Sequence, residues 1–150
     1  MKRFLVDSGF ILALYKNEGE QTKRVRQTFE KIISASESVL VLPWPIMYER
    51  LNSEFIENKG WIKRFNFDWS NLKRARKVEY ADDAPFREAC RKELLGLSPE
   101  RSGRFKALSL ADRILMDLID DHSRNIEALL TLDLAGFSGF CSKKQIEILP

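Results

Sequence analysis

Four acidic residues that are far apart in the chain have the side chains and the positions needed to bind a divalent cation. Asp7 directly follows an apolar run, and Asp133 follows another such run at 126–132. Glu49 and Asp112 lie in the opening turns of predicted helices. If these carboxylates meet, two charges about 4 Å apart repel by roughly 4 kcal/mol at an effective dielectric constant near 20. The cluster must then bind protons or a cation.

The rest of the composition narrows the chemistry of such a site. His122 is the only histidine, and Cys90 and Cys141 stand alone in the sequence. With a single histidine and no cysteine near it in the sequence, Ser-His-Asp and Cys-His catalysis are not expected, and oxygen atoms are the expected metal ligands. Oxygen ligands favour Mg²⁺ or Mn²⁺. In a mildly basic protein, a magnesium site made only of carboxylates indicates metal-assisted hydrolysis of phosphodiesters.

Strands and helices alternate in the hydrophobic pattern. Apolar runs predict strands at 4–6, 39–42, 78–80, 126–132 and 146–149, and apolar residues at helical spacing predict helices between them, for example at 25–33 and 109–119. This alternation is typical of a parallel sheet covered by helices on both faces. We predict an α/β fold with three α/β/α layers, a central parallel sheet of four or five strands, and a single domain over residues 1–150.

Three local features are also predicted. Gly136 and Gly139 mark turns, and residues 96–106 form a polar loop marked by glycine and proline. Cys90 and Cys141 are expected to be ordinary buried or half-buried thiols.

The predicted topology brings the four acids to one edge of the sheet. Asp7 and Asp133 end strands, and Glu49 follows a strand that stops at Pro43. The helix that carries Asp112 runs back against the strand after it, because the connection between them is short. All four acids are therefore expected at the carboxyl ends of the strands, where open α/β sheets bind their ligands.

Bulk properties place limits on partners and location. The formal net charge is +3 and the pI is about 8.9, which is compatible with an anionic partner. No stretch approaches the roughly 20 apolar residues of a membrane span. The short apolar run at the start is broken by Asp7, so it does not resemble a signal peptide. A cytoplasmic protein without membrane contact is expected.

Together, these motifs resemble the PIN-domain ribonucleases, and in particular the toxin component of VapBC toxin–antitoxin modules. The likeness spans residues 4–149. It depends on the order and spacing of four short motifs, which are Val6-Asp7-Ser8, Glu49, Ser109-Leu110-Ala111-Asp112, and Thr131-Leu132-Asp133 with Phe137 after it.

The resemblance implies a PIN-like α/β fold and a ribonuclease that cleaves single-stranded RNA with one or two Mg²⁺ or Mn²⁺ ions. It implies that the metal ligands and catalytic residues are Asp7, Glu49, Asp112 and Asp133. Ser8 and Thr131 match hydroxyl positions that would orient these carboxylates or a water molecule. The expected partners are RNA, an antitoxin protein and a second copy of the chain in a homodimer.

Simpler interpretations of the same residues stay open. Ser109-x-x-Asp112 is also a capping-box pattern, Asp7 and Asp133 are also turn formers, and Glu49 is also an ordinary solvated helix residue. Asp117, four residues after Arg113, is predicted to form an ion pair on a helix surface. A catalytically silent PIN-like module that binds RNA or a protein partner is the alternative function. A haloacid-dehalogenase-like phosphatase is disfavoured, because Gly9 stands where that family has a second acid.

The segment 59–77 combines basic residues with the aromatic residues Trp61, Phe65, Phe67 and Trp69. It has two interpretations. Basic and aromatic side chains could bind phosphates and stack on bases, or dock a partner chain. Alternatively, the segment is a helix with a solvated basic face and aromatic residues in the core.

Overall fold

A parallel sheet forms the centre of the structure, a computed structural model that describes residues 1–16, 19–51, 54–97 and 108–150, without the side chains of residues 48–51, 54 and 56. Five strands in these residues form one sheet in the order β3-β2-β1-β4-β5. All four pairings are parallel. The strands are β1 Lys2–Val6, β2 Ser38–Pro43, β3 Val78–Ala81, β4 Ile126–Leu130 and β5 Glu147–Leu149.

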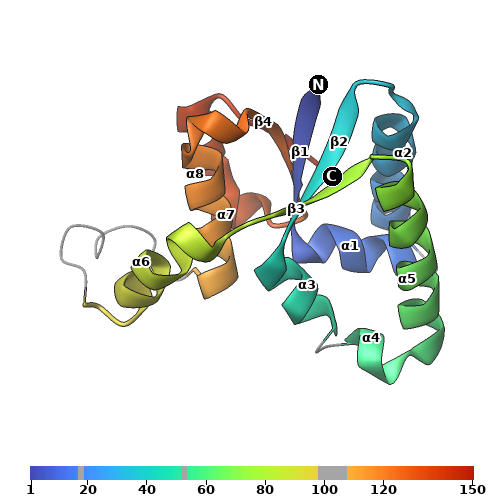
Figure 1. Cartoon of the computed structure of the whole chain (residues 1–150), viewed down its shortest axis with the longest axis horizontal. Helices are drawn as coiled ribbons and strands as arrows, with labels where there is room; N and C mark the ends of the chain where they lie inside the picture. Colours follow the sequence, from blue (N-terminus) through green and yellow to red (C-terminus); the bar gives the residue numbers. More distant parts are fainter. Residues whose placement is uncertain (17–18, 52–53, 98–107) are drawn as a thin grey trace.

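Helices connect the strands and cover both faces of the sheet. In Figure 1, α2 and α5 lie on one side of the sheet, and α7 and α8 lie on the other. The helices are α1 Ser8–Tyr15, α2 Glu20–Ser34, α3 Trp44–Leu51, α4 Glu54–Glu57, α5 Lys59–Arg74, α6 Ala84–Leu94, α7 Leu110–Asp120 and α8 Leu134–Lys144, with a short 3₁₀ turn η1 at His122–Arg124. The predicted three-layer α/β/α fold with a central parallel sheet is confirmed.

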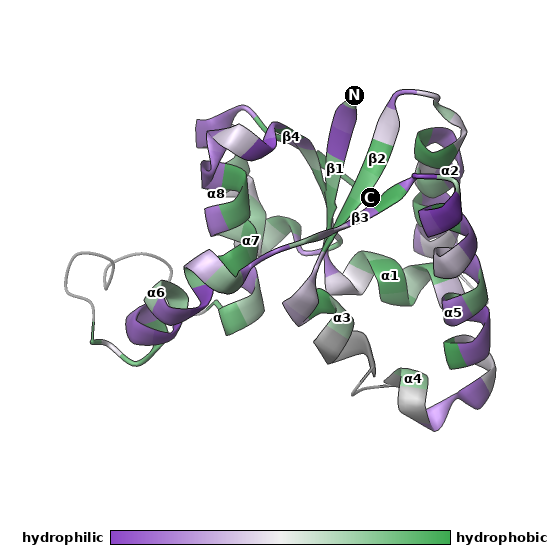
Figure 2. Ribbon diagram, viewed as in Figure 1, coloured by the Kyte–Doolittle hydropathy of each residue, from purple (hydrophilic) through white to green (hydrophobic). Residues whose placement is uncertain are grey.

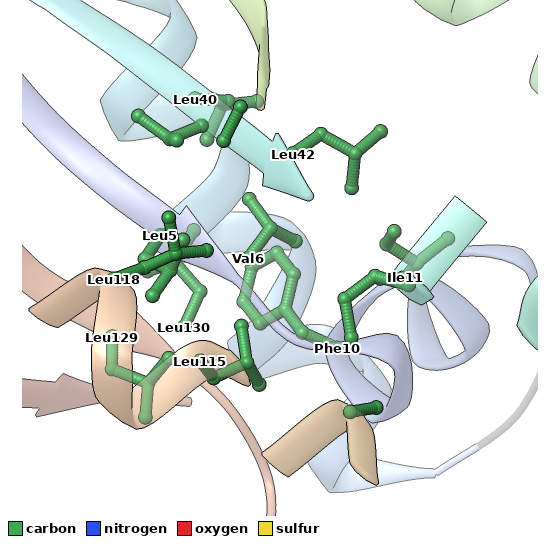
Figure 3. Close-up of a cluster of buried hydrophobic side chains, with 14 of the residues drawn as sticks. Leu5, Val6, Phe10, Ile11, Leu40, Leu42, Leu115, Leu118, Leu129 and Leu130 are labelled. Atoms are coloured by element: carbon green, nitrogen blue, oxygen red, sulfur yellow. The ribbon is translucent and has the colours of Figure 1, made fainter. Parts of the chain in front are cut away.

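The core lies on both faces of the central strands. Leu5 and Val6 of β1 are fully buried, and they pack with side chains from α1, β2, α7 and β4 (Figure 3). Apolar residues face the sheet and polar residues face outward on the covering helices (Figure 2). Strands that are buried on both faces need continuous apolar runs, which explains the runs Leu5-Val6 and Val39–Leu42.

Parallel pairing puts the carboxyl ends of the strands at one edge of the sheet. Neighbouring strands β2, β1 and β4 lead directly to the segments that carry Glu49, Asp7 and Asp133. The helix α7 precedes β4 and is joined to it by residues 121–125, so its first turn, with Asp112, lies toward the same edge. The topology therefore places the segments that carry the four acids toward one edge of the sheet.

Some local predictions differ from the structure. Gly136 and Gly139, expected in turns, lie inside α8, because Asp133 caps a helix that begins at Leu134. The strand expected at 126–132 ends at Leu130. The polar loop expected at 96–106 falls largely on residues 98–107, outside the described residues. Within the part of the chain that the structure describes, no helix combines the length and the apolar character needed to cross a membrane.

Candidate functional site

Asp7 is a buried carboxylate at the end of the central strand. Its side chain is only 7% exposed. It is the N-cap of α1, and its Oδ1 accepts a hydrogen bond of 2.5 Å from the backbone N–H of Ser8. The backbone N–H of Asp7 donates to the carbonyl of Leu130, which fixes this residue against the end of β4. Asp7 therefore belongs to the rigid framework of the sheet edge.

Thr131 connects two of the predicted site residues. Its Oγ1 donates to Asp7 Oδ2 at 2.7 Å, across 124 positions of sequence. The same Oγ1 accepts a hydrogen bond of 3.0 Å from the backbone N–H of Asp133. Thr131 is itself buried, so these bonds are shielded from water. The hydroxyl therefore orients the Asp7 carboxylate and holds the start of the Asp133 loop beside it.

The environment of Asp7 makes its negative charge costly. Burial raises the pKa of the carboxyl above its ordinary value, and the negative charge of Asp112 raises it further. Hydrogen bonds from Thr131 and Ser8 act in the opposite direction, because they stabilise the ionised form. The net pKa shift is upward, so neutral hydrogen-bond donors do not fully compensate this charge. A bound cation would compensate this charge, because an opposite charge nearby favours the ionised form.

Asp112 occupies the first turn of α7, close enough to Asp7 for the two charges to interact. It forms a complete capping box with Ser109. Asp112 Oδ2 accepts from the Ser109 backbone N–H at 3.0 Å and from its hydroxyl at 2.8 Å, and Ser109 Oγ accepts from the Asp112 N–H at 3.2 Å. The capping role foreseen as an alternative is thus present. These bonds engage Oδ2, which leaves Oδ1 for a ligand.

Asp133 is exposed and is the N-cap of α8. Its Oδ1 accepts a hydrogen bond of 2.9 Å from the backbone N–H of Gly136. A Cβ atom placed on Gly136 would collide with the Asp133 carboxylate. Glycine at position 136 therefore lets the carboxylate keep this orientation. The sequence pattern predicted only a turn at Gly136, although a glycine three residues after an Asp at a helix start is the available signal for this role.

Glu49 lies in the second turn of α3, which follows β2 at the same edge. Its side chain is outside the described part of the structure, so its direction relative to Asp7 is not assigned. Among the described side chains, no group of three His, Cys, Asp or Glu residues is arranged closely enough to hold a metal ion. The structure thus brings Asp7 and Asp112 within electrostatic reach and links Asp7 to the backbone of Asp133 through Thr131.

Asp117 differs from its prediction as a surface residue. It is buried, as is Arg113, because α7 packs against both the sheet and α6. The thiol of Cys90 in α6 donates to Asp117 Oδ2 at 3.2 Å. Both cysteines are buried free thiols, as expected. Asp117 thus serves the contact between α6 and α7.

The segment 59–77 forms α5 and then continues toward β3. Phe65 and Trp69 are buried in an aromatic cluster that includes Tyr15 and Phe55, with ring centroids 5.3 to 5.9 Å apart. Phe67 is 68% exposed. The interpretation as a helix with a solvated basic face and aromatic residues in the core is therefore confirmed for Phe65 and Trp69, and Phe67 is the exception.

No protein-family model matches the chain, and no curated protein matches it.

Proposed function

We propose that this chain is a divalent-metal-dependent endoribonuclease of the PIN-domain type, which hydrolyses phosphodiester bonds in single-stranded RNA. The observation that carries the proposal is the Asp7 carboxylate. It is buried at the carboxyl end of the central strand, its pKa is raised, and a second carboxylate adds to its negative field. Perturbed carboxylates in such positions are a mark of functional sites.

The donor chemistry at this edge suits a hard cation. Asp7, Glu49, Asp112 and Asp133 would hold Mg²⁺ or Mn²⁺ through carboxylate oxygens. When bound, such an ion supplies a water of lowered pKa and stabilises negative charge on the phosphate. The chain contributes the orientation of these ligands. Thr131 and Ser8 fix both oxygens of Asp7 by hydrogen bonds, and metal ligands that are held in this way bind more tightly.

The only histidine of the chain has no place in this reaction. His122 is exposed in η1, which directly precedes β4 and so lies toward the amino edge of the sheet, opposite the four acids. Proton transfer at the site would therefore depend on water and carboxylates. A rate profile governed by carboxyl groups and metal-bound water is expected, rather than one set by an imidazole.

The test compares Asp7→Asn with Glu127→Gln in cleavage of a labelled single-stranded RNA. Asp7→Asn should abolish cleavage that depends on Mg²⁺ or Mn²⁺ and leave the fold intact, because Asn is as good an N-cap as Asp. Glu127 is an exposed acid on β4 near the opposite edge, and Glu127→Gln should cleave at the normal rate. Full activity of Asp7→Asn would overturn the proposal.

Metal binding can be measured without turnover. A ligand present at about 100 times its dissociation constant adds roughly 2.7 kcal/mol to the free energy of unfolding. Mg²⁺ or Mn²⁺ should therefore raise the melting temperature of the natural chain and not that of Asp7→Asn. Equal melting temperatures with and without either ion would contradict a metal site at Asp7.

The alternative is a PIN-like module that binds RNA or a protein without cleaving it. One observation favours it: Asp7 and Asp133 are helix N-caps and Asp112 completes the capping box of Ser109, so each has a structural reason to be present. RNA binding without metal-dependent cleavage would support this alternative. A cytoplasmic toxin with an antitoxin partner and a homodimeric state are further parts of the proposal. Co-expression with the product of an adjacent small open reading frame, followed by mass measurement of the complex, tests them.

A further inference from the structure

A pocket opens beside the candidate site, between the starts of α3 and α7 and the segment that follows β3. Its volume is about 600 Å³, and it is lined by Trp44 and Pro45, by Asp83 and Arg87, and by the first turns of α7 from Leu110. Ala111, directly before Asp112, forms part of the wall. The pocket therefore adjoins one of the four acids, and a ligand that extends from it reaches the carboxyl edge of the sheet.

Trp44 is the unusual side chain of this pocket. It is 54% exposed, whereas Trp69 in the aromatic cluster is only 2% exposed. Packing in the core therefore does not explain a tryptophan at position 44. Leu110 on the other wall is also an exposed apolar residue. An exposed indole over a pocket provides a flat platform on which an aromatic ring can stack.

Arg87 places a cation at the rim of the same pocket. Asp83 is fully buried, and its two oxygens accept hydrogen bonds from Arg87 Nε at 2.7 Å and from Nη2 at 2.9 Å. This bidentate pairing fixes the guanidinium group, and the Arg87 side chain as a whole is 54% exposed. Among the contacts of the described residues, Nη1 makes no hydrogen bond to protein. It is a donor in a fixed position for an anionic ligand.

We propose that this pocket binds an unpaired base of the RNA strand, with the base stacked on Trp44 and a neighbouring phosphate near Arg87. The inference rests on the proposed function. It adds that substrate selection depends on an unstacked base, since a base within a duplex cannot present its face to an indole. The net charge of +3 agrees with an anionic ligand.

The exposed Phe67 of α5 provides a matched comparison. It is also an aromatic residue on the surface, 68% exposed, and basic residues Lys63 and Arg74 lie at helical spacing from it. Phe67 is not among the residues that line this pocket. Truncation of Phe67 thus removes an aromatic ring that is more exposed than Trp44 without changing the pocket.

The experiment measures binding of a short labelled single-stranded RNA by fluorescence anisotropy in a buffer with EDTA, which separates binding from cleavage. Trp44→Ala should weaken binding about tenfold, in the range found for single stacked bases. Trp44→Phe should restore most of the affinity, and Phe67→Ala should bind like the natural chain. Circular dichroism melts confirm that each variant is folded, and sedimentation reports its mass.

Three results would overturn the inference. Trp44→Ala could bind RNA as tightly as the natural chain. Phe67→Ala could lose affinity in its place, which would assign RNA binding to α5. Trp44→Ala could change the oligomeric mass with unaltered RNA affinity, which would assign the pocket to a protein interface. If the natural chain cleaves RNA and Trp44→Ala binds RNA as well as the natural chain does, the inference about the pocket is refuted and the proposed nuclease function is not. If RNA binding depends on Trp44 but no cleavage occurs, the proposed nuclease function is refuted and the inference about the pocket is not.

Discussion

Two of the buried carboxylates of this protein, Glu93 and Asp7, differ in how their charge is compensated. Between α6 and α7, buried Glu93 forms an ion pair with buried Arg113. At the carboxyl edge of the sheet, buried Asp7 has a hydroxyl and an amide N–H as partners, and its pKa is raised by burial and by Asp112. The first charge is compensated within the protein. The hydrogen-bond donors to the Asp7 carboxylate among the described residues are neutral, and a proton or a cation would compensate its charge.

This difference distinguishes a charge that is compensated by an ion pair from a charge that is a candidate for function. A buried ion pair stabilises the fold only as a pair, and loss of one partner leaves a costly charge. A buried carboxylate that lacks a basic partner lowers stability, and such a residue is retained where function requires it. Asp7 is thus the strongest candidate for chemistry in the chain, and Glu93 is an element of packing between helices.

The largest expected effect comes from breaking the compensated pair. Arg113→Met should lower the free energy of unfolding by about 3–5 kcal/mol, because it removes a cationic partner of a buried carboxylate. Asp7→Asn should lower the free energy of unfolding by no more than about 1 kcal/mol, since it removes a buried charge and keeps the cap. Urea unfolding of both variants without metal measures the contrast. Equal losses would show that the two carboxylates have the same role.

The pH dependence of stability sharpens the comparison at Asp7. Its pKa is raised on folding, so the native state binds a proton at a higher pH than the unfolded chain does. The stability from this proton is present at low pH and is lost as pH rises through the folded pKa. As pH rises through the folded pKa of Asp7, the metal-free natural chain should therefore lose stability relative to Asp7→Asn.

Thr131→Val tests whether the Thr131 hydroxyl limits the rise in the pKa of Asp7. It removes the hydrogen bond that favours ionised Asp7 and leaves the Asp133 N–H without the hydroxyl that accepts its hydrogen bond. A loss of about 1–3 kcal/mol is expected, with the pH-dependent loss displaced to higher pH. Melting curves from pH 4 to 8 measure both. A Thr131→Val curve that coincides with that of the natural chain would contradict a role for this hydroxyl.

The smallest effect comes from two glycines of α8. Gly136→Ala should displace the Asp133 carboxylate and weaken the cap, at a cost of about 1 kcal/mol relative to Gly139→Ala. A methyl group added at Gly139 would meet open space, so Gly139→Ala should be neutral or stabilising by up to about 1 kcal/mol. If Asp133 is a metal ligand, Gly136→Ala also reduces the stabilisation by Mn²⁺, and Gly139→Ala does not. The same Mn²⁺ effect in both variants would exclude Asp133 as a ligand.

Much of the fold could be predicted from the sequence, because periodicity is a local property. The apolar run Val39–Leu42 and the helical spacing of Ile114, Leu115 and Leu118 appear in the structure as β2 and α7. The short connection between α7 and β4 was sufficient to place Asp112 near the edge that carries Asp7. Glycine is a less secure guide: the residue type of Gly136 predicts a turn, whereas the structure places it in the first turn of α8 behind the Asp133 cap.

The sequence by itself therefore determined the order of strands and helices along the chain and the Ser109–Asp112 capping box, because each depends on residues that are close in the chain. The edge at which the four acids are expected follows from that order, because the carboxyl ends of parallel strands lie at one edge of a sheet. The tertiary structure decided the burial of Asp7, its hydrogen bond from Thr131 and the burial of Asp117 against Cys90. It also decided that Trp44 stays exposed over a pocket. These features depend on which side chains from distant segments share a volume, and that is fixed only when the layers pack.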